Sequence, residues 1–243
     1  MNAIISTRKL RKSFDGRIVL SDIDLDIPEG ALYSVVGQSG TGKSVLFKTL
    51  IGMIKPDSGQ VWYRDTELTA LDRANLIETR HRFGYAFQNA ALFDSMTVGE
   101  NIAFPLREVL GIRNKAEIRA RVTRMLDWIE LPGIEKMRPN ELSGGMRKRV
   151  GVARALVMQP DVVFFDEPTT ETINALVVRV NRELRITCIF ITHDIPAAFR
   201  ISSRIAFLHQ GSIVAEGEPA DVARSEHALV REFIRLSFSE LNL

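Results

Sequence analysis

The sequence is poor in cysteine and has no long apolar run. Its 243 residues include one cysteine, Cys188, so a disulfide framework is excluded. No apolar stretch approaches the roughly 18 residues that a membrane-spanning helix requires, and residues 1–11 lack the apolar segment of a secretory signal. We interpret Cys188, within the apolar run 188–191, as a buried core residue rather than a reactive thiol. These absences predict a cytosolic chain.

A strong excess of one charge is also absent. The chain has 32 basic and 30 acidic residues, which are well mixed and give a net charge of +2. Strong nucleic-acid binding usually requires a basic stripe or patch. The densest basic run, residues 147–149, falls in a predicted helix and is interpreted as a solvated helix face rather than a phosphate-binding patch. We therefore expect no nucleic-acid partner.

The sequence does contain apolar strands that alternate with helices. Residues 1–36 alternate apolar and polar side chains between turn signals at 15–16 and 28–30, a pattern typical of short strands and hairpins. The continuous apolar runs at 162–165 and 187–192 are typical of parallel strands covered on both faces. This alternation predicts an α/β chain with a parallel sheet. We also expect strands at 31–36 and 60–65, helices at 44–54, 144–157 and 172–184, and a C-terminal helix with a tail at 227–243. A further amphipathic helix is expected from the helical spacing of Ile118, Val122, Met125, Leu126 and Ile129. Asn114 would cap its N-terminus, with Glu117 three residues later.

A glycine-rich loop follows the strand expected at 31–36. Residues 37–44 fit the pattern G-x-x-x-x-G-K-[ST] at every fixed position. Glycines allow backbone N–H groups to face phosphate oxygens, and the next helix presents its N-terminus to the same anion. Lys43 would reach the β- and γ-phosphates, and the Ser44 hydroxyl would coordinate Mg²⁺. ATP and Mg²⁺ are therefore the predicted ligands, bound by Gly37, Gln38, Ser39, Gly40, Thr41, Gly42, Lys43 and Ser44.

Two carboxylates end the apolar run at 162–165. Asp166 and Glu167 follow it directly, at the end of a strand where α/β sheets bind ligands. Asp166 would hold Mg²⁺ directly or through water, and Glu167 would orient or deprotonate the attacking water. The alternative for this pair is a solvated strand end.

A third motif narrows the class of phosphate-binding protein. Residues 142–146, L-S-G-G-M, resemble the signature motif of ABC ATPases, which usually ends in glutamine. Ser143 would cap a helix, and the N–H groups of Gly144 and Gly145 would bind an anion. The resemblance implies that Ser143, Gly144, Gly145 and Met146 contact the γ-phosphate held by a second chain, so that ATP lies between two subunits of a homodimer.

The resemblance to ABC ATPases then covers nearly the whole chain. It implies a P-loop NTPase (RecA-like) core with an N-terminal antiparallel β subdomain and an inserted α-helical subdomain. It places the core at 1–88 and 158–243 and the helical part at 89–157 of one domain, 1–243. It implies that Phe14 stacks on adenine, that Gln88 contacts Mg²⁺ and the water, and that His193 lies near the γ-phosphate. The alternatives are that Phe14 is a core-facing aromatic, that Gln88 is a surface glutamine and that His193 is a structural histidine.

One segment resembles a particular subfamily. Residues 87–98 and 101–108, together with Met146 and the following basic run, are similar to the ATPase subunits of Mla/Mce-type phospholipid transporters. The resemblance implies a membrane permease docked near Gln88–Glu108, a Mce-domain protein, in some systems a STAS-domain partner, and a location on the cytoplasmic face of the inner membrane. The alternative is that this segment packs the helical subdomain, as it would in other ABC importers.

The segment after Glu167 departs from the family pattern. ABC ATPases have a loop of the type G-L-D-P there, which crosses the dimer interface, but residues 165–170 run straight into 171–176. Residues of the protein could be missing from this sequence, the deletion could be genuine, or the sequence could be an artefact. We favour the first because every other motif is intact. A genuine deletion would predict ATP binding with impaired hydrolysis.

The sequence therefore predicts an ATP-hydrolysing subunit that powers a membrane permease, with phospholipid as the expected cargo. Other ABC importers or exporters remain alternatives, and so does an ATP-binding scaffold with impaired turnover. An ABC ATPase of DNA repair is disfavoured because the interval from Lys43 to Ser143 is too short for coiled-coil arms.

Overall fold

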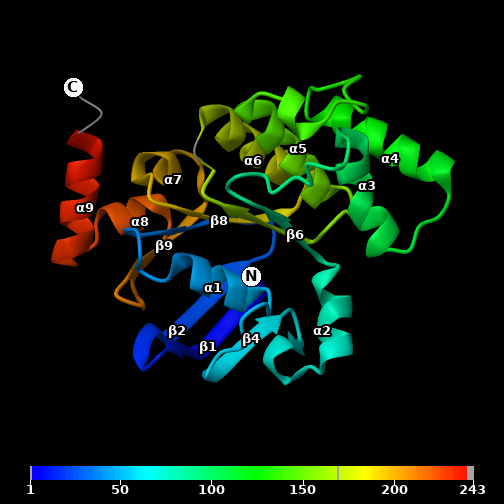
Figure 1. The fold of residues 1–243 in the computed structure, drawn as a ribbon. Coiled ribbons are helices and arrows are strands. Elements are labelled where there is room, and N and C mark those ends of the chain that lie inside the picture. The colour runs from blue at the N-terminus through cyan, green and yellow to red at the C-terminus, as the bar shows by residue number, and fades with distance from the viewer. Residues whose placement is uncertain (1, 169, 240–243) are drawn as a thin grey trace.

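The computed structural model describes residues 2–168 and 170–239, which form two sheets and the helices packed around them (Figure 1). The six-stranded sheet has the order β10-β9-β3-β8-β7-β6 and the four-stranded sheet the order β2-β1-β4-β5. The strands are β1 (Ala3–Phe14), β2 (Arg17–Pro28), β3 (Leu32–Val36), β4 (Ser58–Tyr63), β5 (Thr66–Glu67), β6 (Phe83–Ala86), β7 (Val162–Asp166), β8 (Thr187–Thr192), β9 (Arg204–His209) and β10 (Ser212–Gly217).

Helices cover the six-stranded sheet, with α3 to α6 on one side of it and α1 and the small sheet on the other (Figure 1). The helices are α1 (Lys43–Leu50), α2 (Arg73–Arg80), α3 (Val98–Glu108), α4 (Lys115–Trp128), α5 (Gly144–Leu156), α6 (Glu171–Leu184), α7 (Ile195–Ile201), α8 (Pro219–Ala223) and α9 (Ala228–Ser239), with short 3₁₀ turns at Leu68–Ala70 and Pro139–Glu141. None of the helices in the described part of the chain has the length and apolar character needed to cross a bilayer.

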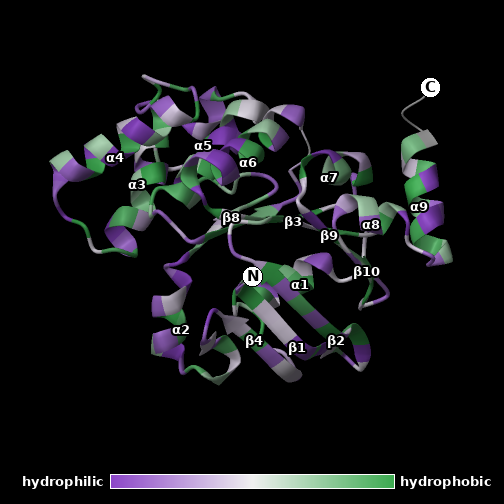
Figure 2. Ribbon diagram, turned by 180° about the vertical axis from the view of Figure 1, so that it is seen from behind, coloured by the Kyte–Doolittle hydropathy of each residue, from purple (hydrophilic) through white to green (hydrophobic). Residues whose placement is uncertain are grey.

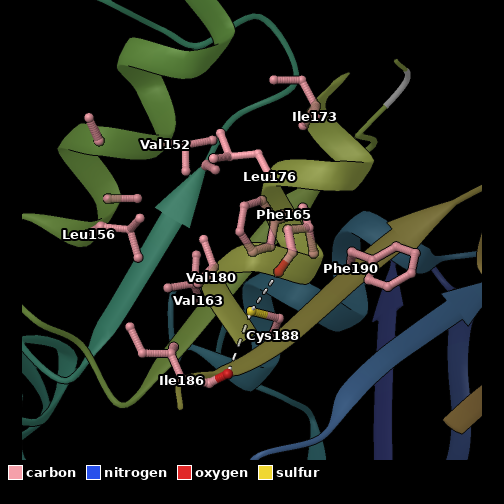
Figure 3. Packing of buried hydrophobic residues seen from close by; sticks show 14 of the residues in the cluster. Val152, Leu156, Val163, Phe165, Ile173, Leu176, Val180, Ile186, Cys188 and Phe190 are labelled. Carbon is pink, nitrogen blue, oxygen red and sulfur yellow. Dashed lines mark hydrogen bonds between the residues drawn. The ribbon is translucent and has the colours of Figure 1, made fainter. Parts of the chain in front are cut away.

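The central strands bury both of their faces, as their continuous apolar sequence predicts. Along β7, Val163 and Phe165 join the cluster beneath α5 and α6, whereas Val162 and Phe164 join the cluster on the α1 side. Strand β8 follows the same rule, because successive side chains of a strand point to opposite faces. Cys188 is fully buried in the first cluster, and its thiol lies 3.7 Å from the Ile186 carbonyl oxygen (Figure 3). The interpretation of Cys188 as a core residue is confirmed.

The predicted α/β arrangement, with an N-terminal antiparallel sheet and inserted helices, is confirmed. The first 36 residues differ in detail, because β1 and β2 are two long paired strands rather than several short ones. Their alternating hydropathy is visible along both ribbons (Figure 2). Helix α1 stops at Leu50, four residues earlier than expected, and Gly52 follows with a positive φ of 69°. Such a conformation is typical of a helix end.

Strand β7 and helix α6 are joined by a short connection. Helix α6 begins at Glu171, and the Thr170 side chain accepts a hydrogen bond from the Ile173 N–H as its N-cap. The explanation that residues were left out is wrong, since the full sequence has 243 residues and passes from Pro168 to Glu171 within three positions.

Candidate functional site

The candidate residues gather at one edge of the six-stranded sheet. Strands β3, β6, β7 and β8 are parallel, so their carboxyl ends meet at the same edge. Each strand is followed by a predicted site segment, and ligands of open α/β sheets bind at this edge. The segments are the phosphate loop at 37–44 after β3, Gln88 after β6, Asp166 and Glu167 at the end of β7, and His193 after β8.

The phosphate loop is shaped by close backbone approaches. Gly42 is the N-cap of α1 with a φ of 103°, and a Cβ there would lie 2.7 Å from the Val19 carbonyl oxygen. A Cβ at Gly37 would lie 2.3 Å from the Leu208 carbonyl oxygen. Only glycine fits at these two positions, whereas Gln38, Ser39 and Gly40 are exposed along the outer face of the loop.

Lys43 lies beneath this loop and is 5% exposed. Its Nζ donates hydrogen bonds of 2.7 Å to the carbonyl oxygens of Gly37 and Gln38. Burial lowers the pKa of Lys43, and the nearby charges of Glu167 and Asp166 oppose that shift. The ammonium group is therefore held close to the acidic pair, and its hydrogen bonds among the described residues go to backbone oxygens, which leaves its charge available to a phosphate.

Asp166 is a half-buried carboxylate at the end of β7. The Tyr85 hydroxyl donates to its Oδ2 at 3.0 Å. Burial raises the pKa of Asp166, the Tyr85 hydrogen bond lowers it, and the charge of Glu167 raises it further. The position therefore favours binding of a cation, which would offset the cost of this buried negative charge.

Glu167 has a strained backbone and two side-chain partners. Its φ is 51°, uncommon for a residue other than glycine, and its N–H donates to the Ile191 carbonyl oxygen at 3.0 Å. The Gln88 Nε2 donates to Glu167 Oε2 at 2.9 Å, and the His193 Nδ1 lies 3.6 Å from Oε1. Strained backbone conformations cluster at functional sites. Three residues that the sequence predicted separately are thus brought into contact.

A small cavity adjoins these side chains. It measures about 20 Å³ and is lined in part by Gln88, Asp166 and Glu167. A cavity of this size holds about one water molecule. Its other lining residues include Val152, Phe165 and Ile173, which belong to the cluster beneath α5 and α6, so the cavity lies on the helical side of Glu167 rather than on the side of the phosphate loop.

The signature segment lies apart from the other site residues. Ser143 is the N-cap of α5, accepting from the Met146 N–H at 3.2 Å, so the predicted cap is confirmed. Gly144 and Gly145 are exposed. Within the described residues, no hydrogen bond or ion pair joins 143–146 to the phosphate loop, Gln88, Glu167 or His193.

Phe14 is the last residue of β1. Its side chain is 44% exposed, and its ring lies 5.2 Å from the Lys12 Nζ. The alternative of a core-facing aromatic is wrong, because so exposed a ring is not part of the core. Its stacking on adenine stays a prediction.

The possible metal ligands are all oxygen donors. Ser44 offers a hydroxyl, Asp166 a carboxylate and Gln88 an amide oxygen, a set that suits Mg²⁺. Among the residues that the structure describes, no group of three or more His, Cys, Asp or Glu could hold a metal ion. These residues fit an ion whose remaining ligands are water and substrate phosphates, which is how Mg²⁺ usually binds.

Two contacts at the site are not indicated by any sequence motif. Tyr85 was not recognised because its partner, Asp166, is identified only by the pairing of β6 with β7. Arg154 of α5 donates to the carbonyl oxygens of Ala90 and Ala91, at 2.6 and 2.7 Å, just after Gln88. Both alanines have positive φ, 61° and 45°, which their sequence does not indicate.

Comparison with known proteins identifies the class of this fold. The family model for ABC transporters matches residues 20–170. The chain is 40% identical, over 95% of its length and 65% of the relative, to the methionine import ATP-binding protein MetN of Rhodopseudomonas palustris. It is 36% identical, over 96% of its length and 69% of the relative, to the probable ribonucleotide transport ATP-binding protein mkl of Mycobacterium leprae. The chain thus spans about two thirds of the length of these curated relatives.

Solved structures agree with this match. The ATP-binding cassette MJ0796, solved as a dimer bound to ADP and Pi, superposes with a TM-score of 0.80 at 30% identity, covering 88% of this chain and 98% of that one. The cbiO1 protein of Clostridium perfringens, part of the ABC transporter complex cbiONQ, gives a TM-score of 0.84 at 28% identity, covering 97% and 96%. The predicted fold class, a P-loop NTPase core with an antiparallel β part and a helical part, is confirmed.

Proposed function

This chain belongs to the ABC transporter family, and on that premise we propose that it is the ATP-hydrolysing subunit of a transporter whose membrane permease is a separate chain. The observation that carries the proposal is the environment of Glu167. Its carboxylate contacts Gln88 and His193, and its negative charge acts on the nearby ammonium group of Lys43.

Each residue of the site has a role in this proposal. Lys43 and the N–H groups of 37–44 bind the phosphates, and Phe14 stacks on the adenine. Glu167 orients the attacking water and accepts its proton, while Gln88 and His193 hold the Glu167 carboxylate in place. Bound Mg²⁺, held by Ser44, Asp166 and Gln88, would neutralise charge on the phosphates.

A second copy of this chain would complete the site. Gly144 and Gly145 expose N–H groups at the start of α5 that no residue of their own phosphate loop contacts. In the proposed homodimer, Ser143, Gly144, Gly145 and Met146 of one copy bind the γ-phosphate held by the other. The similar cassette MJ0796 was solved as a dimer, which supports this arrangement.

The permease is proposed to dock beside Gln88. The exposed rings of Phe87 and Phe93, each 42% exposed, flank this residue, and Phe93 packs against Phe104 with ring centroids 4.9 Å apart. Exposed aromatic side chains are enriched at protein interfaces. The segment Gln88–Glu108 would thus contact the permease on the cytoplasmic face of the inner membrane.

We propose phospholipid as the cargo, with Mce-domain and STAS-domain proteins as further partners. The support is the similarity of residues 87–98 and 101–108 to Mla/Mce-type ATPases. The two relatives described above carry names of methionine import and ribonucleotide transport, so methionine is the competing cargo to test. The complex is purified from its own membranes and reconstituted in vesicles of different phospholipid composition. We expect its rate of ATP hydrolysis to depend on which phospholipid the vesicles contain. A rate that is raised by methionine and does not depend on the phospholipid would contradict the lipid assignment.

The hydrolytic role is tested by Glu167→Gln. We expect fluorescent ATP to bind as tightly as in wild type, and phosphate release to fall by a factor of about 10² to 10⁴, since the general base is removed. Glu226→Gln, a matched change of an exposed carboxylate outside the site, should leave turnover unchanged. Equal turnover in Glu167→Gln and wild type would remove Glu167 from its role. Wild-type binding without turnover would favour an ATP-binding scaffold, the result expected if the short connection after Pro168 disables the dimer.

A further inference from the structure

We propose that Tyr85 is a positioning residue that fixes the rotation of Asp166 toward the metal ion that accompanies ATP. This inference rests on the proposed function and deepens it. It assigns a role in metal binding to a residue within strand β6, in addition to the predicted ligands Ser44, Gln88 and Asp166.

The placement of Tyr85 follows from strand register. Strand β6 pairs in parallel with β7, with Tyr85 beside Phe164. Phe164 and Asp166 are two positions apart on β7 and share a face of the sheet. That face is covered by α1, because Phe164 packs edge-on against Phe47 with ring centroids 5.4 Å apart. Tyr85 packs on the same face, so its hydroxyl reaches Asp166 on the side of the phosphate loop.

The hydrogen bond constrains one carboxylate oxygen and leaves the other open. Tyr85 donates to Asp166 Oδ2 at 3.0 Å, and no other hydrogen bond or ion pair of the Asp166 side chain occurs within the described part of the chain. A carboxylate held by one oxygen has a restricted rotation and presents its second oxygen in a defined direction. Partners of this kind orient ligands and influence metal affinity.

The ring of Tyr85 is itself held. It packs against Phe87 with ring centroids 4.5 Å apart. Phe87 precedes Gln88, which donates to Glu167. Two parallel links therefore join the end of β6 to the end of β7, one from Tyr85 to Asp166 and one from Gln88 to Glu167. The first would hold the metal ligand and the second the proposed base.

The chain provides a matched control beside the amino end of strand β7. Tyr63 donates a hydrogen bond to Asp161, the residue that precedes β7, far from the site edge. Tyr63→Phe and Tyr85→Phe each remove one hydroxyl from a tyrosine–aspartate pair and retain the ring. A purely structural role for Tyr85 predicts similar behaviour of the two variants.

The test measures binding rather than turnover. Affinity for the fluorescent analogue MANT-ATP is titrated in EDTA and then against Mg²⁺, and Mn²⁺ binding is followed by electron paramagnetic resonance with a non-hydrolysable ATP analogue. For Tyr85→Phe we expect unchanged affinity in EDTA but a rise of about tenfold in the Mg²⁺ and Mn²⁺ concentrations at half-saturation. Tyr63→Phe should match wild type. In an Asp166→Asn background, Tyr85→Phe should have no further effect, because its partner is no longer a charged ligand.

The outcomes separate this inference from the proposed function. Suppose that wild type binds the nucleotide in a metal-dependent way and that Tyr85→Phe has the same metal concentrations at half-saturation. This result would overturn the role of Tyr85 and leave the proposed function intact. An equal shift in Tyr63→Phe would do the same, since it would show a general effect on the fold. A wild-type protein that fails to bind the nucleotide would contradict the proposed function and the inference with it.

Discussion

An aspartate precedes strand β7 and another ends it, and the two carboxylates meet different partners. Asp161, at the amino end, accepts from Tyr63, lies 3.8 Å from Arg64, and its backbone N–H and C=O bond to Arg82 and Thr187. The Asp166 carboxylate, at the carboxyl end, accepts from the Tyr85 hydroxyl; burial and the charge of Glu167 raise its pKa, and the charges of Lys48 and Lys43 lower it. Asp161 is therefore bound by neighbours on several sides, whereas burial leaves the ionised form of Asp166 less favourable than in water.

This difference separates a structural carboxylate from a functional one. The pairs Tyr63–Asp161 and Tyr85–Asp166 look alike as isolated contacts, yet only the second lies at the edge where a phosphate loop and a cation would meet. Active sites are often places where favourable electrostatics of the fold are sacrificed. The predictions below probe the contrast between the two ends.

The largest expected effect concerns how slowly a thiol reagent reaches Cys188, which is buried in the sheet. Cys188 pairs with Leu32 and Val163 in the interior, and burial raises the pKa of its thiol. We expect Ellman's reagent to label the native thiol at least about a thousandfold more slowly than the urea-unfolded chain, because labelling requires a large opening of the fold. The single cysteine makes the signal unambiguous. Rapid, complete labelling of the native protein would show that this part of the sheet is open.

The next effect compares the two aspartates directly. Asp166→Asn should lower ATP turnover at least about a hundredfold, since even partners of metal ligands cost that much. It should not lower the melting temperature, because the raised pKa of Asp166 means that the ionised carboxylate destabilises the fold. This destabilisation grows as the pH rises above 3.8, the ordinary pKa of an aspartate side chain. The gain in stability should therefore be larger at pH 7 than at pH 4.

Asp161→Asn is the matched variant and should behave in the opposite way. Turnover should be unchanged, and the free energy of unfolding should fall by about 1 kcal/mol as the bonds to Tyr63 and Arg64 weaken. Urea unfolding and phosphate release measure the two quantities. A variant of Asp161 that loses turnover but keeps its stability would reverse the comparison.

The smallest effect tests the turn that leads into β8 at the amino end. Arg185 ends α6 with φ 57° and ψ 28°, a left-handed conformation that favours glycine. Among the described residues its side chain forms no hydrogen bond or ion pair, so Arg185→Gly should raise the free energy of unfolding by about 0.5 to 1 kcal/mol. Glu130→Gly, at a similar φ of 60°, should gain less because Glu130 pairs with Arg179 at 2.8 Å. A loss of stability in Arg185→Gly would show that the arginine side chain makes a contribution of its own.

Much of the fold was predictable because its signals are local. The run 187–192 coincides with β8, and the predicted helix at 144–157 differs from α5 by one residue. The Asn114 cap was also found correctly, since its side chain accepts from the Ala116 and Glu117 N–H groups. Long strands such as β1 and β2 were not predicted, because their pairing across one tight turn is set by contacts between strands.

In the site, too, local motifs were predictable and contacts between neighbouring strands were not. Lys43, Gln88, Asp166, Glu167 and His193 were identified from motif types, and the structure places them at one sheet edge. The contact between Gln88 and Glu167, the left-handed φ of Glu167 and the role proposed for Tyr85 depend on which strands are neighbours. Sequence spacing contains that information only indirectly, because parallel neighbours are far apart along the chain.

The position of β3 in the sheet also constrains the order in which the protein folds. Strand β3 pairs with β8 and β9, so Leu32 meets Cys188 and Tyr33 meets Arg204. Pairings between such distant residues form slowly, and on the ribosome they must wait until the later strand has been synthesised. The antiparallel strands β1, β2 and β4 need no residue beyond Tyr63 to pair, so they can assemble first. The phosphate loop, although encoded early, reaches its final shape only when nearly the whole chain has emerged.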